Sequence, residues 1–393
     1  MNSLGVNAER HRDHNRRLVL QTLRRHGALS RADLTRRTAL SPQAMSNIAA
    51  GLLAEGLIRP VGRQRGGRGQ PPIGLAINPG GALSLGVDIA PAGLTAVLTD
   101  LIGARIAGHA LPLSHAEPLA VARALPRLVA PLLAEAGGRA VLGMGVVLPA
   151  SFPATLAERP TELPGWAGLP DPARFLSEAL DSALPIRLEN DATAAAIAAN
   201  LCGPARAAQR IACLFLGRGV GLGLVLDGRV YRGATGTAGE IGHVPVVPGG
   251  RLCFCGQQGC LEQHVSAHAA LRDLGLRQES ALDAATALPS WLNEAAPVLA
   301  RAVLIIENLF DPDLILLSGR SEALVAGLAA RCATLPSPLN RRPGPRLVRG
   351  ASGPFSAAEA AAALPLHEQT SLFPSRAPHA FMADAPLAAM ELP

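Results

Sequence analysis

Residues 240–262, EIGHVPVVPGGRLCFCGQQGCLE, contain one histidine and three of the six cysteines of the chain. The side chains able to bind a metal are His243, Cys253, Cys255 and Cys260. One nitrogen and three sulfur donors suit a closed, tetrahedral, structural Zn²⁺ site. Three core cysteines beside a surface histidine are the alternative. The crowding of four ligand-type residues in a glycine-rich loop favours the metal site, because glycines let a loop turn tightly around an ion.

Two carboxylates, Glu240 and Glu262, lie at the edges of this stretch. A metal that fixes the loop would also fix these side chains and the second ring nitrogen of His243. Such a group is suited to hydrogen bonding with the hydroxyls of a sugar. Two solvated glutamates are the alternative on these residues alone.

The pattern EIGH followed by CxCGxxGCLE resembles the signature of the ROK family (repressors, open reading frames and sugar kinases), and the resemblance extends through residues 83–365. It implies an α/β fold of the two-lobed actin-like ATPase, ribonuclease H-like type. Lobe 1 is expected at residues 83–200, lobe 2 with its zinc loop at 201–366, and a loosely ordered tail at 367–393. The sugar-binding residues that the resemblance implies are Asn190, Asp191, Glu240, His243 and Glu262.

Asn190 and Asp191 precede an alanine-rich helical segment. In the sugar kinases that this chain resembles, the asparagine holds the sugar. The aspartate is the general base for the hydroxyl that attacks the γ-phosphate. Spacing alone supports a helix cap equally well, because Asn and Asp are favoured there. The metal-loop signature downstream favours the sugar site.

The nucleotide-binding positions depart from the pattern of the kinases at three places. Their DxGGT turn reads DIAPA at residues 88–92, where proline removes an N–H donor and the alanines add Cβ atoms. Their GTGxGGG turn reads GRGVGLG at residues 217–223, and the glycine expected after Gly319 is Arg320. Phosphoryl transfer requires a positioned triphosphate, so we do not expect kinase activity and expect no catalytic residue.

The first 80 residues differ in charge from the rest. They contain 13 arginines and 4 acidic residues, a net charge of +9, whereas the remaining residues have a net charge of −3. This imbalance predicts a polyanionic partner for the first domain only. Apolar periodicity and capping residues predict helices at 14–25, 31–38 and 43–55, followed by strands at 57–59 and 73–77. This order predicts a winged helix-turn-helix in residues 1–80, with a small helical interaction domain as the alternative.

The third helix of this domain would present small and amide side chains to a major groove. The candidate base-contacting residues are Gln43, Ala44, Ser46 and Asn47, and the candidate backbone-contacting residues are Arg36, Arg37 and Ser41. The wing loop contains Arg63, Arg65 and Arg68, whose guanidinium groups suit a narrow, A·T-rich minor groove. A comparable RGRP segment of ROK repressors reads RGQP here. A flexible basic linker is the alternative.

The chain has no uninterrupted run of 18 apolar residues, and its arginine-rich start has no apolar signal core. We therefore expect a cytoplasmic protein without membrane association, whose cysteines are reduced thiols or metal ligands. Cys202, Cys213 and Cys332 are expected to be small core residues.

These patterns predict a transcriptional regulator of carbohydrate genes, a repressor that responds to a sugar. Its partners would be a double-stranded DNA operator and a sugar or sugar derivative as effector, and the resemblance to ROK regulators implies a homodimer or homotetramer. One alternative is a bifunctional ATP-dependent sugar kinase with a DNA-binding domain. Another is a constitutive DNA-binding protein that uses its ROK body only to dimerise. The hydroxyl-binding residues are common to the whole family, so they do not identify the sugar.

Overall fold

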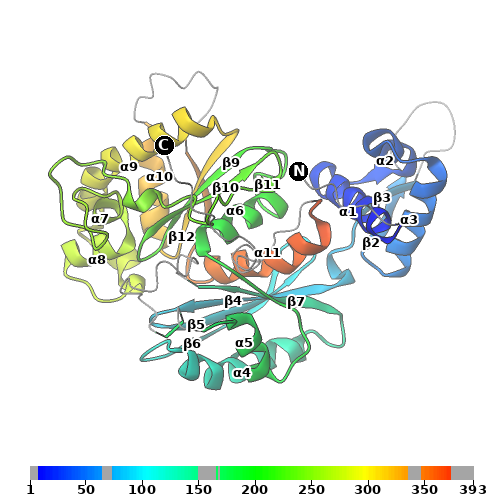
Figure 1. Ribbon diagram of the computed structural model, residues 1–393, viewed down its shortest axis with the longest axis horizontal. Helices are drawn as coiled ribbons and strands as arrows, with labels where there is room; N and C mark the ends of the chain where they lie inside the picture. Colours follow the sequence, from blue (N-terminus) through cyan, green and yellow to red (C-terminus); the bar gives the residue numbers. More distant parts are fainter. Residues whose placement is uncertain (1–7, 64–72, 149–164, 167–168, 335–346, 373–393) are drawn as a thin grey trace, which may run out of the picture.

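A computed structural model of the 393-residue chain describes residues 8–63, 73–148, 165–166, 169–334 and 347–372. Its elements form three sheets, one in a small N-terminal unit and one in each of two larger lobes (Figure 1). None of the described helices combines the length and the apolar character that crossing a membrane requires.

The N-terminal unit is a three-helix fold with a small antiparallel sheet. Its elements are α1 (Ala8–His26), β1 (Leu29–Ser30), α2 (Arg31–Thr38), α3 (Pro42–Ala54), β2 (Ile58–Arg63) and β3 (Ile73–Ile77). The Ser30 hydroxyl accepts a hydrogen bond from the Asp33 N–H (3.1 Å), and the Asp33 carboxylate accepts one from the Ser30 N–H (3.2 Å). Ser41 caps α3 by accepting a hydrogen bond from the Ala44 N–H at 3.2 Å. These caps satisfy free N–H groups, and α2 lies at its predicted residues. By contrast, α1 begins at Ala8, earlier than the predicted residue 14.

The two lobes have the same strand topology. Lobe 1 contains β4 (Leu83–Ala90), β5 (Gly93–Asp100), β6 (Arg105–Pro112), β7 (Val141–Val147) and β8 (Ile186–Glu189) in the order β6-β5-β4-β7-β8. Lobe 2 contains β9 (Ile211–Leu216), β10 (Val220–Leu226), β11 (Arg229–Val230), β12 (Leu314–Gly319) and β13 (Val348–Ser352) in the order β11-β10-β9-β12-β13. In each lobe an antiparallel meander is extended by two parallel strands. Such repetition is the arrangement expected of the two-lobed, ribonuclease H-like class.

Helices α6 (Asp191–Leu201) and α11 (Ser356–Thr370) contact each other between the two sheets (Figure 1). The outer helices of lobe 1 are α4 (Pro118–Glu135) and α5 (Pro172–Leu180). Those of lobe 2 are α7 (Glu262–Val265), α8 (Ala267–Leu274), α9 (Leu288–Phe310) and α10 (Glu322–Ala333). Short 3₁₀ turns are η1 (Pro79–Gly81), η3 (Ile241–His243) and η4 (Glu279–Ala284).

Helix α11 comes after the last strand of lobe 2, and most of it lies within the range predicted for that lobe, yet it packs against β4 and β7 of lobe 1. The contact is close because it is made of small residues: a Cβ added at Gly86 would lie 2.0 Å from the Ala358 carbonyl oxygen. This helix also continues to Thr370, past the start of the tail predicted at residue 367. Its last turn is held by burial, since Leu366 is almost completely buried.

The N-terminal unit is joined to the body through α1. This helix contacts α11, and the buried guanidinium of Arg24 lies beside Cys202, the C-cap residue of α6. A further link runs from the Leu101 N–H to the Pro79 carbonyl, 3.1 Å away. The N-terminal unit is therefore attached to the two helices that lie between the lobes.

Candidate functional site

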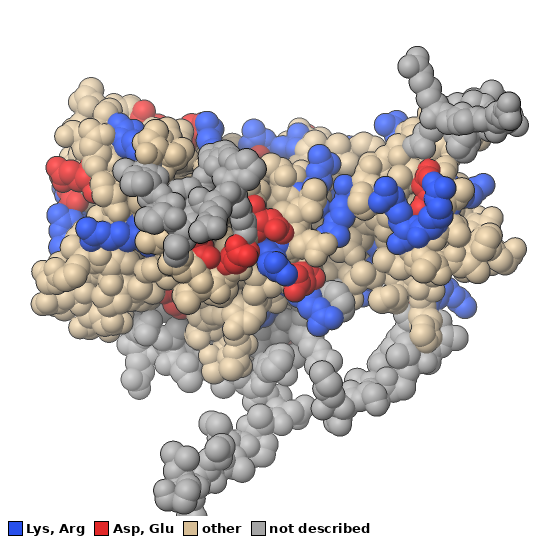
Figure 2. All heavy atoms as spheres, turned by 90° about the horizontal axis from the view of Figure 1, so that it is seen from above, with Lys and Arg blue, Asp and Glu red and all other residues tan. Residues whose placement is uncertain are grey.

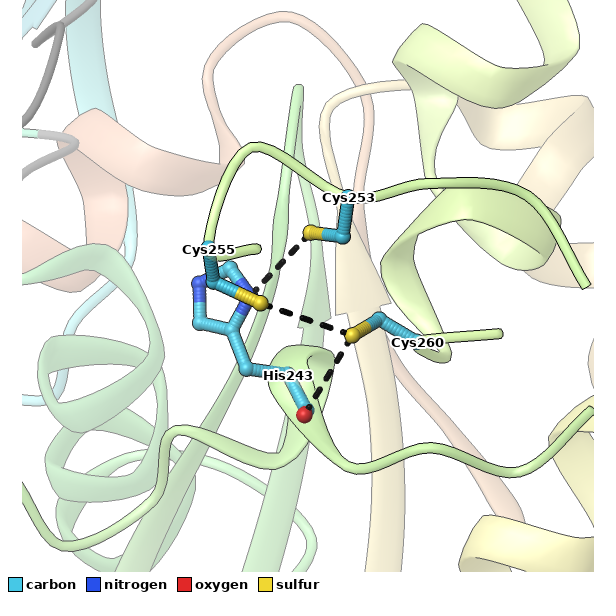
Figure 3. A group of neighbouring side chains, drawn as sticks. All are labelled: His243, Cys253, Cys255 and Cys260. Atoms are coloured by element: carbon cyan, nitrogen blue, oxygen red, sulfur yellow. Dashed lines mark hydrogen bonds between the residues drawn. The ribbon is translucent and has the colours of Figure 1, made fainter. Parts of the chain in front are cut away.

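The four predicted metal ligands form one cluster, in which the candidate ligand atoms all lie within 4.8 Å of one another (Figure 3). The Cys255 and Cys260 sulfurs are 3.6 Å apart, and Cys253 Sγ lies 3.6 Å from His243 Nδ1. Tetrahedral Zn²⁺ with Zn–S bonds of about 2.3 Å places its sulfurs about 3.8 Å apart, so the spacing suits that ion.

The loop reaches this geometry through tight backbone turns and short antiparallel bridges. Pro245 pairs with Cys260, and Leu252 pairs with Gln258. Gly259 has a φ of +79°, and a Cβ there would lie 1.8 Å from the Val247 carbonyl oxygen. Any larger residue would therefore push this part of the loop away from Val247.

The pKa values of Cys253 and Cys260 are raised, so these two thiols stay protonated when no cation is bound. Burial is the main cause, and it raises the pKa of Cys260 to about 12. A metal ion binds thiolates, so it would have to displace these protons. The amide nitrogen of Gln263 lies 3.8 Å from Cys253 Sγ, where it would contact a metal-bound sulfur.

His243 connects the cysteine cluster to the predicted sugar residues. Its Nδ1 faces the cysteines, whereas its Nε2 lies 3.9 Å from a carboxylate oxygen of Glu240. One imidazole can therefore bind a metal through one nitrogen and take part in a polar site through the other.

Asn190 and Asp191 begin helix α6. The Asn190 side-chain oxygen accepts a hydrogen bond from the Thr193 N–H at 2.7 Å, so Asn190 is a helix cap. Its side-chain NH₂ group is not needed for that cap and remains available to a ligand hydroxyl. Asp191 Oδ1 accepts a hydrogen bond from the Ala192 N–H at 2.9 Å. Burial raises the pKa of Asp191, and the nearby guanidinium of Arg320 opposes that rise.

Asp191 and Glu262 both lie next to the turn between β9 and β10. A Cβ added at Gly217 would lie 3.4 Å from Asp191 Oδ2, and a Cβ added at Gly219 would lie 2.5 Å from Glu262 Oε2. Both carboxylates thus lie against the bare backbone of this turn. Leu222, which replaces a glycine of the kinase pattern, is buried in the core of lobe 2.

Two ion pairs between the lobes were not expected from the sequence. Arg320, directly after β12, pairs with Asp88 of β4 through two hydrogen bonds of 2.8 and 2.9 Å. Arg232, after β11, pairs with Glu189 of β8, and Glu189 also accepts a hydrogen bond from the Asn190 N–H. In each pair a lobe 2 arginine binds a lobe 1 carboxylate close to Asn190 and Asp191.

The predicted DNA-contacting residues of the helix-turn-helix lie on an exposed surface. Gln43, Ser46 and Asn47 are exposed on α3, and Gln43 donates a hydrogen bond to Asn47 at 3.2 Å. Ala44 is half-buried. Arg36 is exposed and paired with Asp33, while Arg37 and Ser41 are exposed. Figure 2 shows many basic side chains over this end of the molecule. Arg63 ends β2, whereas Arg65 and Arg68 lie outside the described residues.

A cavity of about 180 Å³ is lined in part by Phe215, and neither Arg320 nor Asp191 is among its lining residues. Its walls come mainly from α6 and α11, include several alanines, and reach Cys202 at the junction with α1. The mostly apolar walls do not suit a sugar, which needs convergent hydrogen-bonding groups. This cavity is therefore separate from the polar site around Asp191.

Residues 84–341 match the sequence profile of the ROK family. The chain belongs to the ROK family. Residues 15–69 match the MarR family. Two relatives align over most of this ROK protein. A xylose repressor of Bacillus spizizenii is 26% identical over 267 residues, covering 67% of this chain and 69% of the repressor. The dual regulator NagC of Escherichia coli is 25% identical over 329 residues, covering 77% and 79%.

A glucokinase of Streptomyces coelicolor is 43% identical to this ROK protein over a shorter segment of 89 residues, 23% of this chain and 28% of the glucokinase. Among solved structures, a ROK family transcriptional regulator described as a homologue of the E. coli MLC protein superposes with a TM-score of 0.68. It is 22% identical and covers 92% of this chain and 98% of its own. This similarity confirms the winged helix-turn-helix followed by the two-lobed α/β domain.

Proposed function

We propose that this ROK protein is a sugar-responsive transcriptional repressor of carbohydrate genes. The observation that carries the proposal is the position of helix α6. The predicted sugar-binding pair Asn190 and Asp191 lies at its N-terminal end, and its C-cap residue, Cys202, lies beside Arg24 of α1 in the DNA-binding unit. One rigid element therefore connects a polar ligand site with the part of the chain that would bind an operator.

DNA recognition is assigned to the exposed surface of α2 and α3. Gln43, Ser46 and Asn47 would reach base edges in the major groove, with Ala44 close to them, whereas Arg36, Arg37 and Ser41 would hold phosphates. The wing arginines Arg63, Arg65 and Arg68 would add contacts in the minor groove. The match to the MarR family over residues 15–69 supports this assignment.

The effector is proposed to be a sugar or sugar derivative whose hydroxyls bind the polar groups around the 217–219 turn. Asp191, Glu240 and Glu262 would accept hydrogen bonds, while the Asn190 amide and the His243 imidazole would donate them. The relatives named as a xylose repressor and as NagC support an effector of this class. Zn²⁺ bound by His243 and the three cysteines would keep Glu240 and Glu262 in place.

Effector and operator binding would be linked because each would favour one arrangement of the lobes and of α1. In a homodimer or homotetramer, such a change would alter the distance between two recognition helices, which must fit half-sites about one helical turn apart. The effector would thereby weaken or strengthen binding to the operator.

A sugar kinase with a DNA-binding domain remains the second candidate, because Asp191 is present and a segment of 89 residues is 43% identical to a glucokinase. Against it, DIAPA at residues 88–92 lacks the glycines of a phosphate-binding turn, and Arg320 fills space beside Gly217. We therefore propose that kinase activity is absent.

The first experiment is a thermal unfolding series with aldoses, N-acetylated amino sugars, sugar phosphates and ATP–Mg²⁺. A ligand at 100 times its Kd stabilises the native state by about 2.7 kcal/mol, which gives a measurable rise in Tm. We expect a rise with one neutral sugar and none with ATP–Mg²⁺. The same sugar should change the affinity for DNA selected from a random duplex library.

Stabilisation by ATP–Mg²⁺ with phosphorylated sugar as product would establish the kinase instead. No response to any sugar would favour a constitutive DNA-binding protein.

A further inference from the structure

Arg320 lies where the two lobes meet, and three of its nitrogens face carboxylates. Its Nε and Nη2 donate to the two oxygens of Asp88 in lobe 1, at 2.9 and 2.8 Å. Its Nη1 lies 3.4 Å from Asp191 Oδ2 at the start of α6. The guanidinium carbon is 5.3 Å from the centre of the Phe215 ring, so the two groups form a cation–π contact. Arg320 is therefore fixed in one orientation by contacts from both lobes.

This arrangement is buried, so its charges interact strongly. The side chains of Asp88, Arg320 and Asp191 are only 2%, 10% and 17% exposed. One guanidinium faces two carboxylates, which leaves a net negative charge. A buried carboxylate without a cation would take up a proton, since burial disfavours its charged form. Arg320 cannot lose its own proton, so it keeps a permanent positive charge beside Asp191.

The neighbouring groups make the site more negative. Glu262 lies against the 217–219 turn opposite Asp191, and Glu279 adds a further negative charge acting on Arg320. Arg218 lies within the same turn as the second cation. The carboxylates outnumber the two guanidinium groups, and that of Arg320 is already bound to Asp88, so a phosphate or carboxylate beside Asp191 would meet a net negative charge. A neutral hydroxyl would instead find an ionised acceptor.

We propose that Arg320 is a positioning residue that closes the two lobes on each other and presents Asp191 as an ionised hydrogen-bond acceptor, so that the site takes a neutral polyhydroxylated ligand and rejects anionic sugar derivatives. This inference rests on the proposed sugar-sensing function and specifies its ligand class. Arg320 itself contributes through Asp191 and Asp88 rather than by direct contact with the ligand.

The first test compares the wild-type chain with Arg320→Met, using as ligand the neutral sugar that stabilises the wild type. Wild-type affinity should be independent of pH between 6 and 8. Arg320→Met should bind at least about tenfold more weakly, the effect of one charge-assisted hydrogen bond. Its affinity should also fall as the pH is lowered through that range, because Asp191 without its cation becomes protonated. Wild-type affinity and an unchanged pH profile in Arg320→Met would overturn the proposal.

Two further variants separate positioning from a merely structural role. Arg320→Lys keeps the charge without the forked geometry, so it should restore a flat pH profile but only part of the affinity. The double variant Arg320→Met with Asp191→Asn has no titratable group at position 191, so its residual affinity should be independent of pH. Persistence of the pH dependence in the double variant would show that another group titrates.

Anionic analogues test the ligand class. The 6-phosphate and the uronic acid of the same sugar should bind the wild type at least about tenfold more weakly than the neutral sugar, a discrimination that Asp88→Asn should reduce. Equal binding of the charged and neutral forms would contradict the proposal.

The connection between the lobes is tested without any ligand. Small-angle X-ray scattering should give a larger radius of gyration for Arg320→Met than for the wild type. Arg349→Met, which removes an exposed ion pair with Glu322 inside lobe 2, is the matched control and should leave the radius unchanged. An unchanged radius in both variants would exclude the interlobe role. If no sugar binds the wild type but the radius of gyration of Arg320→Met is larger than that of the wild type, the proposed sugar sensing has failed while the interlobe contact stands.

Discussion

The buried guanidinium of Arg24 on α1 lies beside the thiol of Cys202, the C-cap residue of helix α6. The opposite end of the same helix is capped by Asn190 at the candidate ligand site. A displacement of α6 on ligand binding would therefore move a residue that contacts the DNA-binding unit.

Arg24→Met should weaken the coupling between the two sites without removing either site. We expect effector affinity to stay within about twofold of the wild type, because Asn190 and Asp191 are untouched. The effector-induced change in operator affinity should fall towards the lower end of the 1–3 kcal/mol that is usual for such coupling. Fluorescence anisotropy with labelled operator, with and without effector, measures this. A full response in Arg24→Met would show that the signal travels elsewhere.

Asn190 has a structural role as a helix cap and a proposed role in ligand binding, and two substitutions distinguish them. Asn190→Ala should cost about 1 kcal/mol of stability and weaken effector binding. Asn190→Ser keeps a capping oxygen but lacks the amide, so it should be nearly as stable as the wild type while losing affinity. Chemical denaturation and calorimetric titration give the two quantities. Wild-type affinity in Asn190→Ser would restrict Asn190 to the cap.

The cysteine cluster should hold one zinc ion per chain, as measured by elemental analysis of the purified protein. Cys260→Ser should lose that ion and about 3 kcal/mol or more of stability, because the loop is folded around it. Effector affinity should fall with it, since Glu240 and Glu262 flank the loop. Cys332→Ala, outside the cluster, is the control and should retain the metal. Full zinc content in Cys260→Ser would rule out this ligand set.

The buried histidine His367 on α11 should lower the free energy of unfolding of the protein in acid. Burial lowers the pKa of His367 from 6.5 to about 4. Above pH 6.5 the imidazole is neutral in both the folded and the unfolded chain, so it has no effect there. Between pH 6.5 and 4 the unfolded chain binds a proton that the folded chain excludes, and stability falls by about 3 kcal/mol.

His367→Gln should therefore lose less stability than the wild type as the pH is lowered from 6.5 to 4. Urea unfolding at a series of pH values measures the difference. His115→Gln, an exposed histidine, serves as the control and should follow the wild type. Parallel curves for His367→Gln and the wild type would refute the prediction.

Phosphate contact by Arg37 can be checked through the salt dependence of operator binding. Each phosphate neutralised contributes about 0.9 to the slope of log K against log salt concentration. Arg37→Ala should reduce the slope by that amount and weaken binding to all sequences alike. Arg174→Ala, an exposed arginine paired with Glu178 on lobe 1, should leave the slope unchanged.

Local signals in the sequence predicted several elements closely. Ser30 and Ser41 with their following residues indicated the starts of α2 and α3, because caps act over three or four residues. The β3 strand lies at its predicted residues 73–77. By contrast, α11 was not predicted, because its run of alanines has no apolar face that a period of 3.6 would reveal.

The sequence by itself determined which four residues form the candidate metal site. All four lie within eighteen residues of one chain segment, and tight turns bring them together. It also determined that a basic helix-turn-helix precedes a ROK domain. Only the tertiary structure decided that Arg320 pairs with Asp88, a residue 232 positions away in the other lobe. It likewise decided that α6 connects Asn190 to the Arg24 contact. The physical reason is that such pairs form where separate sheets and helices pack, and no local spacing encodes that packing.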